Sequence, residues 1–347
     1  MNIPFSPNAN LGAVGWDSRE QAIRTLNDPA LYRIVVLLVP GFSQLSLSSF
    51  IDPLRAANSV SERTLFSWAV SSTDGGLVES ASGISVLAHR TFASVATDLR
   101  SGDRPAMILV CAGDTVEGQA SVSLVKLLRL SRRHRIPIAA LGTATWLLAE
   151  NGILDDDTAC TIHWEKLTAL CETFGRLQVT DSLFVRDGDV VTCAGELASF
   201  DLAMELISYR CGVDSASAVC RQTTAGQWRV GSDRQWSTGA QYASLSKKVA
   251  EVIRLMEQHV EDTLSLHDIA KCVGLSRRQI ERLFERYVSC SPMRYYARLR
   301  LERAKRLIEQ TNMPFLEIAV ACGFVSSSHF SKCFREIFGK TPSDWRS

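Results

Sequence analysis

Two stretches near the C-terminal end are rich in side chains that can form hydrogen bonds with the edges of bases. The first contains Arg278, Gln279, Glu281 and Arg282, and the second contains Ser327, Ser328, His329, Ser331 and Lys332. Arginine can bond to guanine through two parallel hydrogen bonds, serine can bond to any base, and lysine adds contacts to guanine or phosphate. These residue types indicate base recognition in double-stranded DNA, provided that both stretches lie on exposed helices.

Arginines close to these stretches could hold phosphates. They are Arg286, Arg294, Arg298 and Arg335. Residues 241–347 hold 18 Lys and Arg against 12 Asp and Glu, whereas the rest of the chain holds 20 against 25, although the whole chain has a formal net charge of only +1. A basic part joined to an acidic part predicts that only the C-terminal part meets a polyanion.

The two stretches belong to an internal repeat. Residues 268–275 match 317–324 at an offset of 49, and the apolar residues of 280–284 match those of 330–334 at an offset of 50. Each copy predicts a short helix, a glycine turn and a second helix, because glycine permits the tight turn and the apolar positions pack the two helices together. This is the pattern of a helix-turn-helix unit.

Residues that start helices support this interpretation. Ser276 and Gln279 form a capping-box pattern, Ser291 with Pro292 can open a long connecting helix, and Pro314 can open the first helix of the second copy. Two such units joined by a long helix could occupy successive major grooves, roughly 34 Å apart. A helical bundle with a solvated basic face is the alternative, but the paired glycine turns, the caps and the positive charge favour DNA binding.

These residues also carry a family resemblance. The stretch that begins Leu264-Ser265-Leu266-His267 and the stretch from Glu317 to Arg346 look like the DNA-binding domain of the AraC/XylS family, over about 245–346. The most specific segments are Cys322-Gly323-Phe324, the run from Ser328 to Phe334 and the final Gly339-Lys340-Thr341-Pro342-Ser343. The resemblance implies a seven-helix module with two recognition helices and, usually, transcriptional activation.

The N-terminal part alternates apolar strands with helices. Strands are expected at 34–39, 66–71, 107–111, 136–141, 183–186 and 190–193, and helices at 45–58, 122–135, 164–174 and 198–209. Alternation of this kind predicts a parallel sheet covered on both faces. The expected fold is a doubly wound, flavodoxin-like α/β domain followed by an all-α double helix-turn-helix domain.

Residues 32–209 resemble the PfpI-like branch of the class I glutamine-amidotransferase-like superfamily. The resemblance is carried by 39–42, 139–150, 161–164 and 192–195, and together with the AraC-type module it indicates the GlxA type of regulator. Enzymes of that superfamily place a cysteine at a strand-to-helix turn beside an acidic residue. The corresponding positions here are Gly142 and Ser46, so we expect no enzyme activity, because both groups are missing.

What remains is a crevice at the carboxyl ends of parallel strands, where such sheets bind small molecules. Its expected lining, each member of which could equally be a core or capping residue, is Ser46, Cys111, Gly113, Gly142, Thr143, Trp146, His163, Trp164 and Glu196. Similar regulators often have glycine after Cys-Ala-Gly, where this chain has Glu196. The carboxylate could simply favour a helix N-terminus, or it could bind a cationic nitrogen together with a Trp face.

The expected organisation is a flexible arm at 1–30, a sensing and dimerisation domain at 31–211, a linker at 212–244 and the DNA-binding domain at 245–347. The ten cysteines form no Cys-x-x-Cys pair and indicate buried free thiols in a reducing compartment. The chain shows neither a signal peptide nor an apolar run of the ~20 residues that would span a bilayer. We therefore expect a cytoplasmic protein with no cofactor, metal site or membrane partner.

These features predict a dimeric, DNA-binding transcriptional regulator that activates a catabolic operon. Its expected partners are promoter DNA, RNA polymerase and a small effector that is an amine, an amino acid or a betaine-like compound. Two alternatives stay open at this point: an N-terminal domain with amidase or protease activity, and one that serves only for dimerisation.

Overall fold

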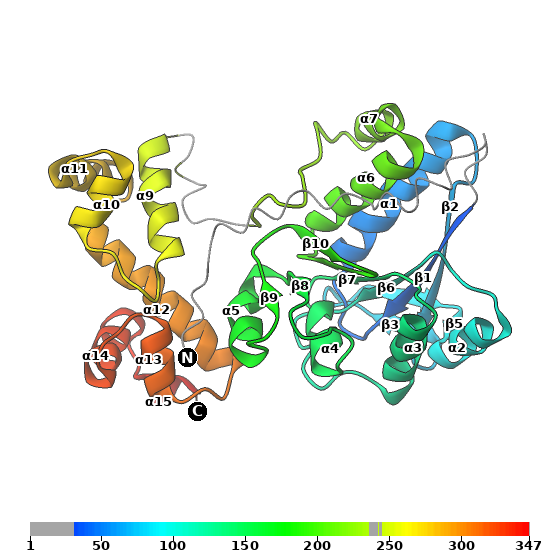
Figure 1. Ribbon diagram of the computed structural model, residues 1–347, viewed down its shortest axis with the longest axis horizontal. Helices are drawn as coiled ribbons and strands as arrows, with labels where there is room; N and C mark the ends of the chain where they lie inside the picture. The colour runs from blue at the N-terminus through cyan, green and yellow to red at the C-terminus, as the bar shows by residue number, and fades with distance from the viewer. Residues whose placement is uncertain (1–30, 236–241, 243–244, 347) are drawn as a thin grey trace. The chain divides into compact units, whose positions relative to one another are not determined.

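The computed structural model of the protein describes residues 31–235, 242 and 245–346. The expected arm at 1–30 lies outside the described residues. The described chain divides into two compact units, one ending at Gln235 and the other lying beyond it (Figure 1).

The first unit is built on a seven-stranded sheet with the order β10-β11-β7-β6-β1-β2-β5. The strands are β1 (Tyr32–Leu38), β2 (Phe66–Ser72), β5 (Arg90–Thr91), β6 (Met107–Cys111), β7 (Ile138–Leu141), β10 (Phe184–Asp187) and β11 (Val190–Cys193). All neighbours pair in parallel except β10 and β11. The central strands β6 and β7 are wholly buried, as expected for parallel strands covered on both faces.

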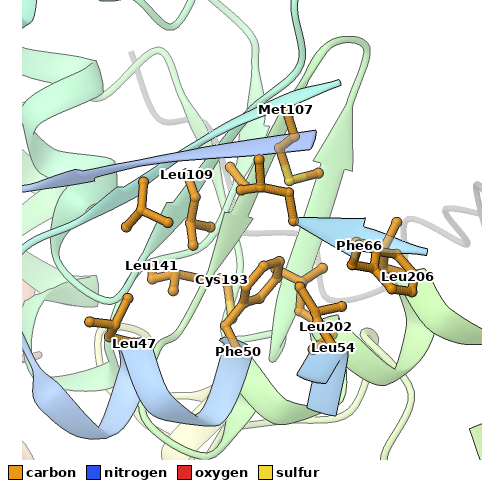
Figure 2. Close-up of a cluster of buried hydrophobic side chains, with 14 of the residues drawn as sticks. Leu47, Phe50, Leu54, Phe66, Met107, Leu109, Leu141, Cys193, Leu202 and Leu206 are labelled. Atoms are coloured by element: carbon orange, nitrogen blue, oxygen red, sulfur yellow. The ribbon is translucent and has the colours of Figure 1, made fainter. Parts of the chain in front are cut away.

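Helices cover both faces of this sheet, which confirms the predicted doubly wound α/β fold. One face carries α1 (Gln44–Ser61), α6 (Ala198–Cys211) and α7 (Val213–Gln222), and the other carries α2 (Phe92–Ser101), α3 (Val122–Arg133), α4 (Ala144–Glu150) and α5 (Trp164–Thr173). Figure 2 shows the first core, where Phe50 of α1 and Leu202 of α6 face Leu109 and Cys193 of the sheet.

Several short elements were missing from the sequence prediction. They are the helices α2 and α4, strand β5, the hairpin of β3 (Gly76–Glu79) and β4 (Ser85–Ala88), and the pair β8 (Ala159–Cys160) and β9 (Gln178–Val179). Most are too short to show a hydrophobic period, so tertiary contacts determine them.

The boundary at 211 and the linker at 212–244 need correction, because the chain from 212 to 235 packs on the first unit. Helix α7 lies against α1 and α6. Residues 229–235, which we call the strap, then follow the edge of the sheet: Leu183 N–H donates to Asp233 O (2.8 Å) and Gln235 N–H donates to Asp181 O (2.9 Å). The strap resembles a linker in sequence, but hydrogen bonds hold it to the first unit, whereas α7 before it packs through buried Ala216, Val219 and Cys220.

The second unit is helical. Its described helices are α9 (Lys247–Gln258), α10 (Leu266–Val273), α11 (Arg277–Tyr287), α12 (Pro292–Gln310), α13 (Phe315–Ala321), α14 (Ser327–Phe338) and α15 (Pro342–Arg346). One core surrounds Ile280 and Phe284, and a second surrounds Phe330 and Phe334, so each copy of the repeat has its own core. In the part of the chain that the structure describes, no helix is both long and apolar enough to cross a membrane.

Candidate DNA interface and effector crevice

Helices α10 and α11 form the first helix-turn-helix. Gly274 has φ +68° at the turn, and Ser276 and Gln279 form the predicted capping box at the start of α11. Ile280 and Phe284 are buried, whereas Arg278, Gln279, Glu281 and Arg282 are exposed. Gln279 Oε1 accepts the Ser276 N–H at 2.7 Å, so this side chain is engaged in the cap. Arg277 is also exposed at the first position of α11, and the sequence prediction omitted it.

Helices α13 and α14 form the second helix-turn-helix in the same way. Gly323 has φ +71° at the turn, and Ser326 caps α14 by accepting the His329 N–H at 3.2 Å. The sequence prediction gave no cap for this helix. Pro314 is the residue before α13 rather than its first residue. The remaining predicted base-reading residues are exposed or half-exposed: Ser327, Ser328, His329, Ser331 and Lys332.

The four arginines that were predicted to hold phosphates are all exposed. Arg298 pairs with Glu302 at 3.0 Å, and the Arg286 guanidinium lies 5.2 Å from the centre of the Tyr287 ring. Arg294 and Arg298 lie on the connecting helix α12, while Arg286 and Arg335 lie near the ends of the two second helices. Exposed cations on these elements suit contacts with a phosphate backbone.

In the first unit, three segments of the predicted crevice meet directly. Gly142 follows β7 with φ +64°, and its N–H donates to Cys193 O at 2.9 Å. A Cβ added to Gly195 would lie 2.6 Å from Gly142 Cα, so the two glycine backbones are in contact. Ser46 Oγ at the start of α1 accepts the Glu196 N–H at 2.6 Å. The position that corresponds to the missing cysteine therefore lies beside Ser46 and Glu196.

Glu196 has an unusual backbone at this point. Its φ is +50°, in the left-handed region that a residue with a side chain rarely adopts. Its carboxylate Oε1 accepts a hydrogen bond from Ser43 Oγ at 2.8 Å, and Ser43 Oγ also caps α1 by accepting the Ser46 N–H at 3.0 Å. Side chain and backbone of Glu196 are thus both tied to the first turn of α1.

The neighbouring thiols are unsuited to nucleophilic chemistry. Cys111 Sγ donates weakly to Ser43 O at 3.7 Å, and its burial together with the nearby charge of Glu196 raises the pKa of this thiol far above its usual range. Burial likewise raises the pKa of Cys193 to about 12. Because the thiolate is the reactive form, neither sulfur replaces the absent cysteine.

Gly113 and Thr143 join neighbouring loops in this region. A Cβ on Gly113 would lie 1.6 Å from Gly41 O, so only glycine permits this approach of two backbones. Thr143 Oγ1 donates to Gly113 O at 2.5 Å. These two predicted residues hold the loops together, and the Thr143 hydroxyl is already used in doing so.

Trp146, Trp164 and His163 have aromatic and charged neighbours of their own. Trp146 is 5% exposed in the core of the α2–α5 face, its ring meets Phe174 edge-on at 5.3 Å, and Lys166 lies 5.8 Å above it. Trp146 therefore does not offer an open aromatic surface. His163 precedes α5, with its ring 5.8 Å from that of Trp164 and its Nδ1 3.9 Å from Glu165.

Two cavities, of about 130 and 240 Å³, lie at the opposite end of the sheet. The first lies beside Arg33, Trp68 and Arg90, and the second beside Arg132, Asp155 and Asp189. None of the predicted crevice residues lines either one. Among the described residues, no group of His, Cys, Asp and Glu side chains is arranged to hold a metal ion.

Comparison with known proteins agrees with both halves of this architecture. The model of the DJ-1/PfpI family matches residues 32–209, and that of a helix-turn-helix domain matches 269–347. The fold and the paired helix-turn-helix units thus define a DNA-binding transcriptional regulator.

Relatives that span both units make this more specific. The chain is 36% identical to the HTH-type transcriptional regulator GbdR of Pseudomonas aeruginosa over 89% of this chain and 83% of that protein. It is 36% identical to CdhR of the same species, over 90% of each chain, and 34% identical to GlxA of Rhizobium meliloti, over 90% and 95%. The protein belongs to the AraC-type regulators of the GlxA kind, which carry a DJ-1/PfpI domain ahead of the helix-turn-helix domain. The relatives are named as regulators, so its role is in regulation and not in catalysis.

Proposed function

We propose that this regulator activates a catabolic operon when a small nitrogenous metabolite, an amine, amino acid or betaine-like compound, binds in its non-catalytic N-terminal unit. The observation that carries the proposal is Glu196, a carboxylate on left-handed backbone beside Gly142. Strained backbone of this kind persists only where the surrounding structure holds it, and it gathers at ligand sites. A cationic nitrogen would take over the Glu196 oxygen that Ser43 Oγ now binds.

The missing cysteine leaves room for a side-chain atom at Gly142. A Cβ on Gly142 would have no neighbour closer than 3.9 Å, and Ser46 Oγ is among the three nearest atoms. The turn that holds a nucleophile in related enzymes thus has room for a Cβ beside Ser46, whose Oγ also accepts the Glu196 N–H. With Trp146 buried, Trp164 is the remaining candidate for an aromatic contact with the cation.

The strap offers a route from this crevice towards the DNA-binding unit. Asp201, in the first turn of α6 just after Glu196, accepts hydrogen bonds from Arg229 N, Nε and Nη2 at 2.7, 3.0 and 2.6 Å. Gln235 Nε2 donates to Thr161 Oγ1 and Ile162 O, both at 2.8 Å, immediately before His163. Both ends of the strap are therefore tied to segments that carry crevice residues, which supports a ligand-driven shift between two arrangements of the units. We further propose a homodimer that contacts RNA polymerase.

A thermal-shift screen of the full-length protein tests the proposal. The panel holds amines, amino acids and quaternary ammonium carboxylates, with neutral compounds of the same size as controls. A ligand at 100 times its Kd stabilises the bound state by about 2.7 kcal/mol, enough for a shift of several degrees. A flat panel at millimolar concentration would contradict the cationic effector and favour a domain that serves only for dimerisation.

Substitution of Glu196 gives the sharper test. Glu196→Gln keeps the shape of the side chain but removes its charge, so we expect the affinity for the cationic ligand to fall by about tenfold or more. Glu62→Gln is the matched control, because Glu62 is an exposed glutamate with φ +52° at the far end of α1. Unchanged affinity in Glu196→Gln, measured by calorimetry, would remove Glu196 from the site.

A further inference from the structure

The two helix-turn-helix units meet halfway along the connecting helix α12. Tyr296 near its start is fully buried in the core of the first helix-turn-helix, whereas Leu301, Ala304 and Leu307 are buried in the core of the second helix-turn-helix. Arg300 lies between these positions and is half-buried. The contacts between the two helix-turn-helix units at this part of α12 decide how far apart α11 and α14 lie.

Two side chains one turn apart on α12 bind backbone atoms of both helix-turn-helix units. The Tyr296 hydroxyl donates to His259 O and accepts the Leu264 N–H at 3.4 Å, so it joins the two ends of the loop between α9 and α10. Arg300 Nε donates to Cys322 O at 2.7 Å and Nη2 donates to Gly323 O at 2.6 Å, in the turn between α13 and α14. These are charge-assisted bonds to carbonyls just past the end of α13.

The loop between α9 and α10 and the turn of the second helix-turn-helix are also in direct contact. A Cβ on Gly323 would lie 2.6 Å from both Val260 O and Glu261 O. The equivalent glycine of the first helix-turn-helix, Gly274, has nearly the same backbone, with φ +68°. An added Cβ there would have no neighbour within 4 Å. The close approach is therefore a property of the second turn alone, and left-handed geometry does not explain it.

We propose that Tyr296, Arg300 and Gly323, here called the joint, are positioning residues that hold α11 and α14 at one fixed spacing. The half-buried hydrogen bonds and the backbone contact oppose sliding of the two helix-turn-helix units, so the two base-reading surfaces engage DNA as a rigid pair. The binding site must then consist of two boxes at a single separation, about one helical turn apart. This inference concerns the DNA-binding unit and is independent of the proposed effector.

In vitro selection from random DNA duplexes with the full-length protein supplies the probe. We expect an enriched sequence with two boxes at one spacing. Insertion of one base pair between the boxes should then weaken binding of the wild-type protein by about tenfold or more, as if one box contact were lost. A wild-type protein that tolerates the insertion would overturn the proposal.

Variants of the joint separate positioning from stability. Gly323→Ala should lose the spacing preference but keep the affinity for a duplex with a single box, whereas Gly274→Ala, with the same backbone strain, should keep the preference. Arg300→Lys retains the charge but cannot bind two carbonyls as a fork, and it should act like Gly323→Ala. Circular dichroism checks folding, and if Gly323→Ala is unfolded, Arg300→Lys decides the question. Wild-type spacing preference in the folded joint variants would refute it.

Discussion

Gly142 and Gly195 are in backbone contact at the predicted crevice, and each has a left-handed backbone, with φ +64° and +84°. Their surroundings differ. An added Cβ has space at Gly142, whereas at Gly195 it would lie 2.6 Å from Gly142 Cα and 3.0 Å from Ser46 Oγ. Gly142 thus has room for a side-chain atom, whereas Gly195 is a position that packing reserves for glycine.

Alanine substitution should separate these two roles. Gly142→Ala should lower the free energy of unfolding by about 1–2 kcal/mol, the cost of left-handed backbone with a Cβ. Gly195→Ala should cost about 2–5 kcal/mol, because overpacking against backbone adds to that strain. Urea denaturation of the two variants measures the difference. Equal costs would mean that the backbone contact relaxes without penalty.

At the scale of elements, α11 depends on local signals and acts through its exposed side. Its capping box starts the helix at a defined residue, and Ile280 and Phe284 fix which side is buried. Arg282 then lies on the exposed side within the helix, while Arg286 lies in the last turn over the Tyr287 ring. We infer that the first reads a base and the second holds a phosphate.

Arg282→Ala should therefore weaken binding to the selected duplex by about 1–3 kcal/mol and relax the base preference at one position. Arg286→Ala should weaken binding to all sequences alike and should reduce its salt dependence. Binding to the selected duplex and to its single-base variants at two salt concentrations measures both effects. An equal loss on specific and random DNA would make Arg282 a phosphate contact.

At the scale of the whole molecule, the strap is the last described segment of the first unit before the chain continues towards the DNA-binding unit. Its anchor is Asp201, which is 3% exposed and accepts three hydrogen bonds from Arg229. Arg234 pairs with Asp181 at 2.8 Å in a more exposed setting. The two arginines are thus a matched pair on one strap: the carboxylate partner of Arg229 is buried, and that of Arg234 is half-exposed.

Arg229→Met should destabilise the first unit by about 3 kcal/mol or somewhat less, because it leaves a buried carboxylate without its charged partner while the Arg229 side chain itself is 43% exposed. Arg234→Met should cost at most about 1 kcal/mol. If the strap transmits the signal, Arg229→Met should also abolish the effector response but keep DNA affinity. Thermal unfolding and a reporter assay measure these outcomes. A normal response in Arg229→Met would exclude this anchor as the route.

Several features follow from the sequence alone because their signals are local. The apolar run of β1 and the fully apolar β6 predict buried strands, and the repeat with its glycine turns predicts two helix-turn-helix units. The absence of a cysteine at Gly142 can be read directly from the resemblance. Caps and hydrophobic periods depend on residues a few positions apart, so no tertiary information is needed to recognise them.

Other features depend on contacts between distant residues. The segment 212–235 resembles a linker until Arg229 meets Asp201, and Trp146 resembles a binding residue until Phe174 covers it. Gly274 and Gly323 are equivalent in the repeat, yet only Gly323 touches the other helix-turn-helix, in the loop between α9 and α10. The sequence by itself determined the fold class, the repeat and the missing nucleophile, whereas the strap, the tie between Glu196 and Ser43, and the joint were decided by the tertiary structure, because each requires segments far apart in the chain to meet.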